Sequence, residues 1–169
     1  MDAYQAIMTR RSIRAYSSES VSEESVKDLL AAAMAAPSAN NQQPWQFIVI
    51  TERTLLDDLA TVLPYGQMLN LAPVAIIVCG DMAHEKSKGY WVQDCSASTQ
   101  NILLAAHARG LGAVWVGVYP RTEQVRDVSR KLHLPETVIP FCAIALGHPA
   151  ETKPPSKRFD PSRIHHNGW

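Results

Sequence analysis

Two kinds of hydrophobic pattern alternate along this chain. Continuous apolar runs predict strands, and they lie at residues 45–51, 73–79, 113–118 and 138–146. Stretches with apolar residues three and four positions apart predict helices, and they lie at residues 2–8, 22–36, 55–62, 90–109 and 122–132. This order predicts a mixed α/β domain with about four strands and a layer of helices on either side of the sheet.

Several residues refine these elements. Ser22 is expected to cap the second helix, because a serine oxygen accepts hydrogen bonds from the free N–H groups of a first turn. The run at 73–79 is apolar at every position, which predicts a strand buried on both faces. Pro140 cannot donate a backbone hydrogen bond, so the last strand is expected to begin irregularly or to have an unpaired edge there. In the short first helix, three apolar side chains are expected to point inward: Tyr4, Ile7 and Met8.

The longest predicted helix has small residues at its centre, from Cys95 to Thr99. Small side chains let another helix approach closely, so we expect this helix to pack centrally or across a dimer axis. Asp94 and Asn101 lie seven positions apart on one face of it. They are expected to form hydrogen bonds across an interface.

Composition narrows the class of protein. The 169 residues suffice for one domain, or for one subunit of an oligomer that shares its core. A formal net charge of zero argues against a nucleic-acid-binding protein, and no apolar run reaches the length of a membrane span. Three widely spaced cysteines in apolar surroundings predict buried reduced thiols and a cytoplasmic setting. The histidines show no spacing typical of a metal site.

The composition changes from Pro149 onward. Residues 149–169 contain several prolines and basic residues and end with a tryptophan, without the apolar pattern of a core. We therefore expect an extended C-terminal arm that lies against a second subunit.

Two segments carry the candidate chemistry. The first, Arg10-Arg11-Ser12-Ile13-Arg14, gathers three guanidinium groups and a hydroxyl within five residues. Guanidinium groups bind phosphate oxygens through paired hydrogen bonds, so this segment suits a phosphate. The second, residues 37–45, reads Pro-Ser-Ala-Asn-Asn-Gln-Gln-Pro-Trp. Its amide side chains offer donors and acceptors together, which suits the edge of a heteroaromatic ring. Together the segments indicate a phosphorylated, ring-bearing cofactor.

Each of these residues also has a purely structural interpretation. Paired arginines are commonly solvated surface groups, and asparagine and glutamine commonly serve turns and caps. Among the amides, Asn40 best fits that structural role. Trp45 is expected to pack in the core or an interface, and Trp115 in the core. Tyr90 and Trp91 either cover a ligand or only pack.

The two segments, in this order and at this spacing, resemble signatures of the nitroreductase family of FMN-dependent NAD(P)H oxidoreductases. The stretch from Asp94 to Gly117 and the basic ending with Arg158 are collinear with the same family. The resemblance implies an α+β fold with three α/β/α layers and a mostly antiparallel central sheet. It also implies an intertwined homodimer formed from a single domain, 1–169, with FMN sites between the subunits.

The resemblance further implies ping-pong chemistry without a catalytic side chain or a metal. Hydride would pass from NAD(P)H to N5 of a tightly but non-covalently bound FMN, and then to a nitroaromatic, a quinone or a related electrophile. Arg14 would approach the N1 and O2 edge and favour the two-electron reduced flavin. The implied cofactor-binding residues are Arg10, Arg11, Ser12, Arg14, Pro37, Ser38, Ala39, Asn41, Gln43, Gln67, Val116, Gly117 and Arg158. Those from Pro37 to Gln43 would come from the partner subunit.

The sequence departs from many family members in two places. Only Asp81 to Gly89 separates the buried strand from the central helix, where longer relatives have a helical excursion. Some of those relatives also carry a glutamate shortly before the position of Gly117, whereas this chain has Val116 there. From the segment that follows Tyr65, either Gln67 or Asn70 would contact the flavin, and we prefer Gln67.

Other functions stay open on the sequence alone. Within the same family, the acceptor could differ, as in reductive dehalogenation or enone reduction, because a fold does not determine a substrate. The chain could instead be a flavin-binding carrier or sensor without turnover. A phosphate-binding module without flavin is a third possibility.

Overall fold

The computed structural model describes residues 1–169, and its centre is a four-stranded antiparallel sheet in the order β1-β2-β4-β3. The strands are β1 (Trp45–Ile50), β2 (Val74–Asp81), β3 (Gly112–Gly117) and β4 (Val138–Gly147). Each begins and ends within two residues of its predicted bounds. The order places β1 and β3 at the two edges of the sheet.

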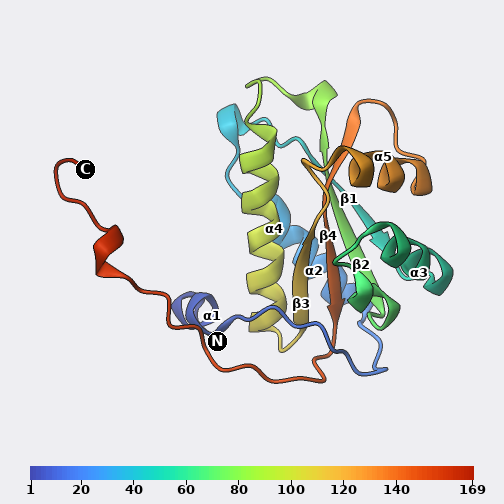
Figure 1. The fold of residues 1–169 in the computed structure, drawn as a ribbon, viewed down its shortest axis with the longest axis horizontal. Coiled ribbons are helices and arrows are strands. Elements are labelled where there is room, and N and C mark those ends of the chain that lie inside the picture. Colours follow the sequence, from blue (N-terminus) through green and yellow to red (C-terminus); the bar gives the residue numbers. More distant parts are fainter.

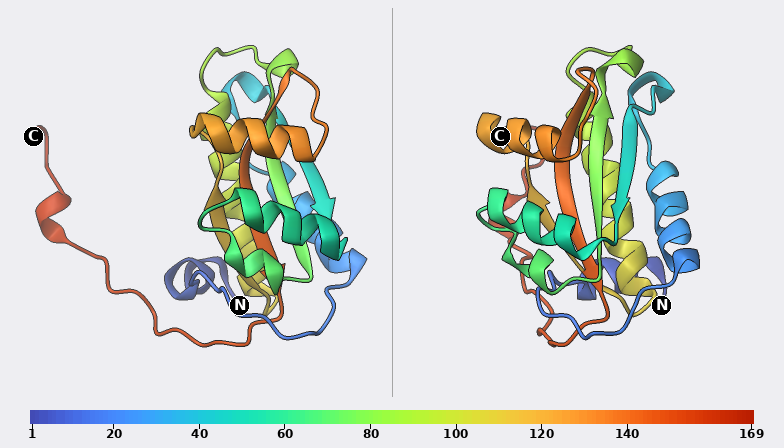
Figure 2. Two further views of the ribbon diagram at one scale, coloured as in Figure 1. Left: turned by 45° about the vertical axis from the view of Figure 1, so that its right-hand side comes forward. Right: turned by 90° about the vertical axis from the view of Figure 1, so that its right-hand side faces the viewer.

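The chain forms five helices: α1 (Ala3–Thr9), α2 (Glu23–Met34), α3 (Arg53–Val62), α4 (Trp91–Ala108) and α5 (Thr122–Lys131). Helices α2 and α4 cover one face, and α3 and α5 cover the other (Figures 1 and 2). Four short 3-10 turns join these elements: η1 (Ala39–Asn41), η2 (Gln67–Asn70), η3 (Met82–His84) and η4 (Pro161–Arg163). The predicted α/β/α layering and antiparallel sheet are therefore confirmed. None of the helices combines the length and the apolar composition that crossing a membrane requires.

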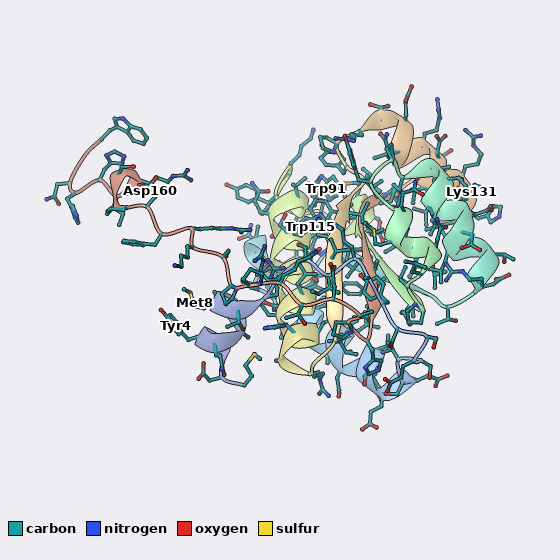
Figure 3. All side chains as sticks on the ribbon, turned by 60° about the horizontal axis from the view of Figure 1, so that its bottom comes forward. Tyr4, Met8, Trp91, Trp115, Lys131 and Asp160 are labelled. Carbon is teal, nitrogen blue, oxygen red and sulfur yellow. The ribbon has the colours of Figure 1, made fainter.

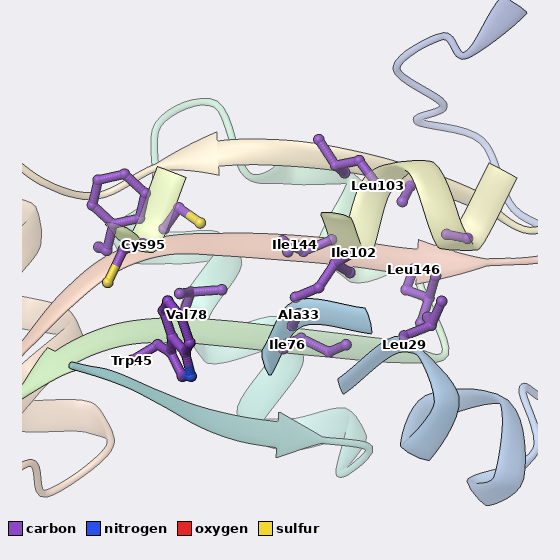
Figure 4. Close-up of a cluster of buried hydrophobic side chains, with 14 of the residues drawn as sticks. Leu29, Ala33, Trp45, Ile76, Val78, Cys95, Ile102, Leu103, Ile144 and Leu146 are labelled. Carbon is purple, nitrogen blue, oxygen red and sulfur yellow. The ribbon is translucent and has the colours of Figure 1, made fainter. Parts of the chain in front are cut away.

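Alternate residues of β2 contribute to two separate cores. Ile76 and Val78 pack against Leu29 of α2 and Ile102 of α4 (Figure 4). On the opposite face, Ala75, Ile77 and Cys79 pack with residues of α3 and η2, among them Leu56, Leu59 and Leu69. Residues 74–80 of β2 are all buried, so the predicted burial of this strand on both faces is confirmed.

Two local predictions are also confirmed. The Ser22 hydroxyl oxygen accepts a hydrogen bond of 3.1 Å from the Ser25 N–H and caps α2. Near Pro140 the pairing of β2 with β4 shifts, because Val78 pairs with Cys142 while the next residue, Cys79, pairs with Pro140. Phe141 is the additional residue of this bulge, which is the irregularity expected from the proline.

The three cysteines are free and fully buried, as predicted. Cys79 lies on β2, Cys95 on α4 and Cys142 on β4. Burial raises the pKa of the Cys79 and Cys142 thiols to about 12, because a thiolate would be poorly solvated there. The thiols are therefore protonated and chemically inert at neutral pH.

The expectation for the first helix is wrong. Only Ala6 of α1 is buried, whereas Tyr4, Ile7 and Met8 are 74%, 56% and 49% exposed. Figure 3 shows Tyr4 and Met8 at the margin of the molecule, apart from the tryptophans in its body. The helix is too short to reach the sheet and touches the chain mainly through α4, so its other apolar side chains have no cover within one chain.

The interface hydrogen bonds expected from Asp94 and Asn101 of α4 stay a prediction, while both side chains form bonds within the chain. The Asn101 Nδ2 donates to the Ala32 carbonyl of α2 at 2.9 Å. Asp94 accepts from the Ala39 N–H and from Gln42. The central packing expected for α4 is confirmed, since it packs against α2 and the sheet and Ser98 and other small residues of its centre are fully buried. Packing of α4 across a dimer axis stays a prediction.

The aromatic residues divide between the core and the surface. Trp45 and Trp91 are buried, and Trp115 is partly buried against the α2 and α4 side of the sheet. Tyr90 is exposed. From His148 onward the chain is extended apart from η4, and it runs away from the body of the molecule (Figure 1). Phe159 on this arm is 83% exposed, so the predicted contact of the arm with a second subunit stays a prediction.

Candidate functional site

The arginine-rich segment after α1 is fixed against the edge strand β3. The Ile13 N–H donates to the Ala113 carbonyl at 3.1 Å, and Ser12 forms an isolated bridge with Ala113. Gly112 permits this approach, because a Cβ atom there would lie 2.7 Å from Cγ2 of Ile13. The backbone thus directs the side chains of residues 10–14 to one edge of the sheet.

Tyr16 anchors the end of the same segment. Its hydroxyl oxygen lies 2.7 Å from the Ile13 carbonyl oxygen and 3.1 Å from that of Ala145, so its single proton is shared between two backbone acceptors. Burial raises the pKa of Tyr16, which keeps the hydroxyl protonated and able to donate.

The beginning of the C-terminal arm closes over this segment. The Lys153 Nζ donates to the Ser12 carbonyl at 2.8 Å and forms an ion pair of 2.8 Å with Glu151. The Glu151 carboxylate in turn accepts from the Arg14 N–H at 2.6 Å, and an Arg11 guanidinium N–H donates to the Pro154 carbonyl. The hydrogen bond from Lys153, followed by that from the Arg14 N–H, lowers the pKa of Glu151.

These contacts create a basic pocket of about 280 Å³ lined by Arg10, Arg11, Ser12, Arg14, Lys153 and Arg158. None of its four arginines forms an ion pair with a carboxylate within 4.0 Å, whereas Lys153 is paired with Glu151. Partial burial, and then the charges of Arg158 and Arg11, lower the pKa of Arg10. So many cations without counter-charges favour binding of an anion.

A groove of about 540 Å³ adjoins the basic pocket, and Arg14 lines both. Gln67, Val116 and Gly117 line the groove, but Asn70 does not. Its other walls come from the turn before η2, from η2 itself and from β3: Pro64, Tyr65, Met68, Val114 and Trp115. The groove combines apolar walls with one amide and one guanidinium, which suits a flat polar ring more than a second phosphate.

The structure therefore brings together the arginine segment, Gln67, the end of β3 and Arg158. It does not bring the amide-rich residues to them, since Pro37, Ser38, Ala39, Asn41 and Gln43 line neither cavity. The amide-rich loop bonds to Asp94 near the start of α4, while Thr9, beside Arg10, bonds to His107 near its end. Thirteen residues of helix separate these two points by about 20 Å.

Comparison with known proteins identifies the family. The sequence model of the Nitroreductase family matches residues 7–67 and 60–148. This chain belongs to the Nitroreductase family.

Relatives match over nearly their whole length. A Methanothermobacter thermautotrophicus protein, provisionally named NADH dehydrogenase/NAD(P)H nitroreductase, is 53% identical over 169 residues, which cover 100% of this chain and 88% of the relative. The crystal structure of a Parabacteroides distasonis protein with the same provisional name has a TM-score of 0.95 and 41% identity, covering 99% and 98% of the two chains. A Desulfovibrio desulfuricans protein, provisionally called a nitroreductase and solved in complex with FMN, has a TM-score of 0.86 and 36% identity, covering 100% and 98%.

The amide-rich loop has an unusual backbone. Asn40, Asn41 and Gln43 have positive φ angles of 49°, 51° and 48°, a region that residues other than glycine seldom adopt. The Gln43 N–H donates to the Ser38 hydroxyl oxygen at 3.1 Å, and the Gln43 side chain donates to that of Asn41 at 2.7 Å. The Asn40 amide donates to the Ser87 hydroxyl oxygen at 2.6 Å, which agrees with the structural role expected for it.

Sequence reasoning missed three residues in or beside the candidate site. Lys153 lines the basic pocket, and its place within a basic arm was a signal that went unused. Tyr65 lines the groove next to Gln67, and the Arg121 guanidinium carbon lies 5.3 Å from the centre of its ring. Gln42 is the buried member of the amide-rich loop, and no pattern distinguishes it from its neighbours in the sequence.

Proposed function

We propose that this chain binds FMN in the basic pocket and the adjoining groove, and that it is an NAD(P)H-dependent oxidoreductase. Its acceptor is an electrophilic small molecule such as a nitroaromatic or a quinone, and reduction follows a ping-pong order. The observation that carries the proposal is the convergence of four arginines without carboxylate partners on one pocket, one of which, Arg14, also lines the adjoining groove.

The basic pocket fits a phosphate. Arg10, Arg11 and Arg158 supply planar donor pairs that match phosphate oxygens, and Lys153 adds a point charge. Because these arginines lack carboxylate partners, a dianionic phosphate would bind without breaking ion pairs between arginine and carboxylate.

The groove fits a heteroaromatic ring. Val116 and Met68 offer apolar contact, and the Gln67 amide offers a donor and an acceptor to a ring edge. Gly117 is exposed, and no heavy atom lies within 4 Å of the position that a Cβ would occupy, so its backbone is accessible to a ligand. Arg14 lines both cavities, which suits a mononucleotide with phosphate and ring at opposite ends. The relative from Desulfovibrio desulfuricans, in complex with FMN, supports this assignment.

When bound, FMN supplies the hydride transfer between the nicotinamide and the acceptor. The chain supplies binding, orientation and electrostatics, and its buried cysteines are unsuited to act as nucleophiles. Arg14 places a fixed positive charge where the groove meets the basic pocket. That charge favours a flavin that has gained electrons.

We propose further that the active form is a homodimer of single-domain subunits in a cytoplasmic setting. The amide-rich loop then completes the groove of the partner subunit, because it lines neither cavity of its own chain. Exposed apolar side chains on α1 and on the arm at 149–169 support the same assembly, among them Tyr4, Ile7, Phe159 and Trp169.

Anaerobic mixing with NADH or NADPH tests the proposed activity. The purified protein, reconstituted with FMN, is expected to be yellow, to bleach with at least one nicotinamide and to regain its colour on addition of a quinone. An Arg10→Ala, Arg158→Ala double variant is the control with a disrupted basic pocket. Pigment without bleaching would indicate a flavin carrier or sensor, and a colourless protein would overturn the assignment of FMN.

A further inference from the structure

A buried carboxylate lies beneath the amide-rich loop. Asp94 is 4% exposed and has no cationic side chain within 4.0 Å. Its Oδ1 accepts from the Ala39 N–H at 2.9 Å, and its Oδ2 accepts from the Gln42 Nε2 at 2.5 Å. It also stands in the first turn of α4, where the helix dipole favours a negative charge.

Gln42 links this carboxylate to a second loop. Gln42 as a residue is also 4% exposed. Its Oε1 accepts from the N–H groups of Lys86 and Ser87, both at 2.8 Å. One amide therefore joins the amide-rich loop, the start of α4 and the loop before it. A buried network of this kind holds a single arrangement, because each unmade hydrogen bond would leave a desolvated polar group.

The network holds a backbone that would not persist unaided. Asn40, Asn41 and Gln43, the neighbours of Gln42, all have left-handed φ angles. Such conformations in residues other than glycine survive where the surroundings over-determine them, and they are concentrated at ligand-binding sites.

We infer that Asp94 and Gln42 are positioning residues for the cofactor ring: they hold the amide-rich loop in the shape in which Ser38, Asn41 and Gln43 meet the flavin. This inference rests on the proposed function. Both residues act through the loop, and neither lines the basic pocket or the groove. Their effect is therefore confined to the ring end of the cofactor and leaves the phosphate end unchanged.

The polarity of the hydrogen bonds makes the inference testable by an exchange of groups. In Asp94→Asn, the NH2 group of the new side chain must face either the Gln42 Nε2 or the Ala39 N–H. Two hydrogen-bond donors then oppose each other. In Gln42→Glu, two carboxylates meet at the site of the present 2.5 Å hydrogen bond. In the double exchange, the Asn at 94 donates to the Glu at 42 and accepts from Ala39, while the Glu still accepts from Lys86 and Ser87. All the hydrogen bonds named above are then restored.

The experiment measures dissociation constants of FMN and of riboflavin, by flavin fluorescence, for the full chain and its variants. Riboflavin lacks the phosphate, so the ratio of the two constants reports on the basic pocket alone. We expect Asp94→Asn to weaken both ligands by the same factor, about 10-fold or more. The double exchange is expected to restore most of the affinity. Ser98→Ala is the matched control in α4, because the buried Ser98 hydroxyl has no hydrogen-bond partner, and it should bind both ligands as the wild type does.

Three results would overturn the inference. Asp94→Asn could bind as the wild type does, it could lose FMN affinity alone, or the double exchange could stay as weak as the single variants. Failure of the wild type to bind either flavin is a distinct result, which would overturn the proposed function and this inference with it.

Discussion

The Glu151 carboxylate accepts a hydrogen bond of 2.6 Å from the backbone N–H of Arg14, a residue 137 positions earlier in the chain. Lys153 pairs with the same carboxylate, so Glu151 is neutralised without engaging the Arg14 guanidinium. The contact fixes the Arg14 backbone and leaves its side chain free for a ligand. The arginine segment and the C-terminal arm thus form one structural unit.

This unit should weaken in acid. The pKa of Glu151 is lowered from its ordinary value of 4.5, so its contribution to stability is present above about pH 4.5 and is lost as the pH falls through the folded-state pKa. Carboxylates titrate in the range of about pH 3 to 5. Across this range, we expect the urea midpoint of the wild type to fall more steeply than that of Glu151→Gln. Glu136→Gln, at an exposed glutamate without a hydrogen-bond partner, is the control and should keep the wild-type slope.

Arg10→Ala should weaken FMN binding and leave riboflavin binding nearly unchanged, because Arg10 faces the phosphate end of the site. Loss of a hydrogen bond between charged groups costs about 1.5–3 kcal/mol, which corresponds to roughly 10- to 150-fold in affinity. Titration calorimetry with both ligands measures the difference. Arg126→Ala removes an exposed arginine already paired with Asp127 and serves as the control. Equal losses for the two ligands would refute a phosphate role for Arg10.

Arg14→Ala should lower the midpoint potential of bound FMN, because a fixed positive charge beside the ring stabilises the electron-rich reduced form. A spectroscopic redox titration of the reconstituted variant against the wild type measures this shift. Arg11→Ala removes a charge that lines the basic pocket but not the groove, and it should change the potential less. An unchanged midpoint in Arg14→Ala would contradict the role assigned to this residue.

Gly112→Ala should disturb the site through the backbone. The added methyl group would lie 2.7 Å from Cγ2 and 2.9 Å from Cβ of Ile13, a β-branched side chain that cannot easily move aside. We expect a loss of about 1–3 kcal/mol in the free energy of unfolding, with weaker FMN binding. Gly168→Ala adds its methyl group to open space and should change neither quantity. Wild-type stability in Gly112→Ala would show that Ile13 does not fix the arginine segment.

The hydrophobic pattern predicted most of the fold because each strong element carries its own signal. The seven apolar residues from Pro73 match β2, and the long periodic stretch matches α4. The apolar residues of α1 misled the prediction, because a seven-residue helix with one buried alanine leaves them uncovered in a single chain. Periodicity reports which side of a helix is apolar, but it cannot report whether the same chain covers that side.

The site was predicted unevenly for a related reason. Arg10 to Arg14 could be proposed from the resemblance because their signature is short and local, whereas Gln67 was only preferred over Asn70. Lys153 and Tyr65 join the site through contacts between segments far apart in the sequence, and the basic composition of the arm does not single out Lys153. Asp94 was recognised as a polar residue on a central helix, but its partner, Gln42, became evident only from the folded loop.

The central claim is that FMN lies between the basic pocket of one subunit and the amide-rich loop of another. Sedimentation of the FMN-saturated protein, followed at the visible flavin band, tests it most directly. The account predicts that bound flavin sediments with a species of twice the 18.7 kDa chain mass, at one FMN per chain. Flavin that sediments with a single chain, or a protein that stays colourless in excess FMN, would contradict it.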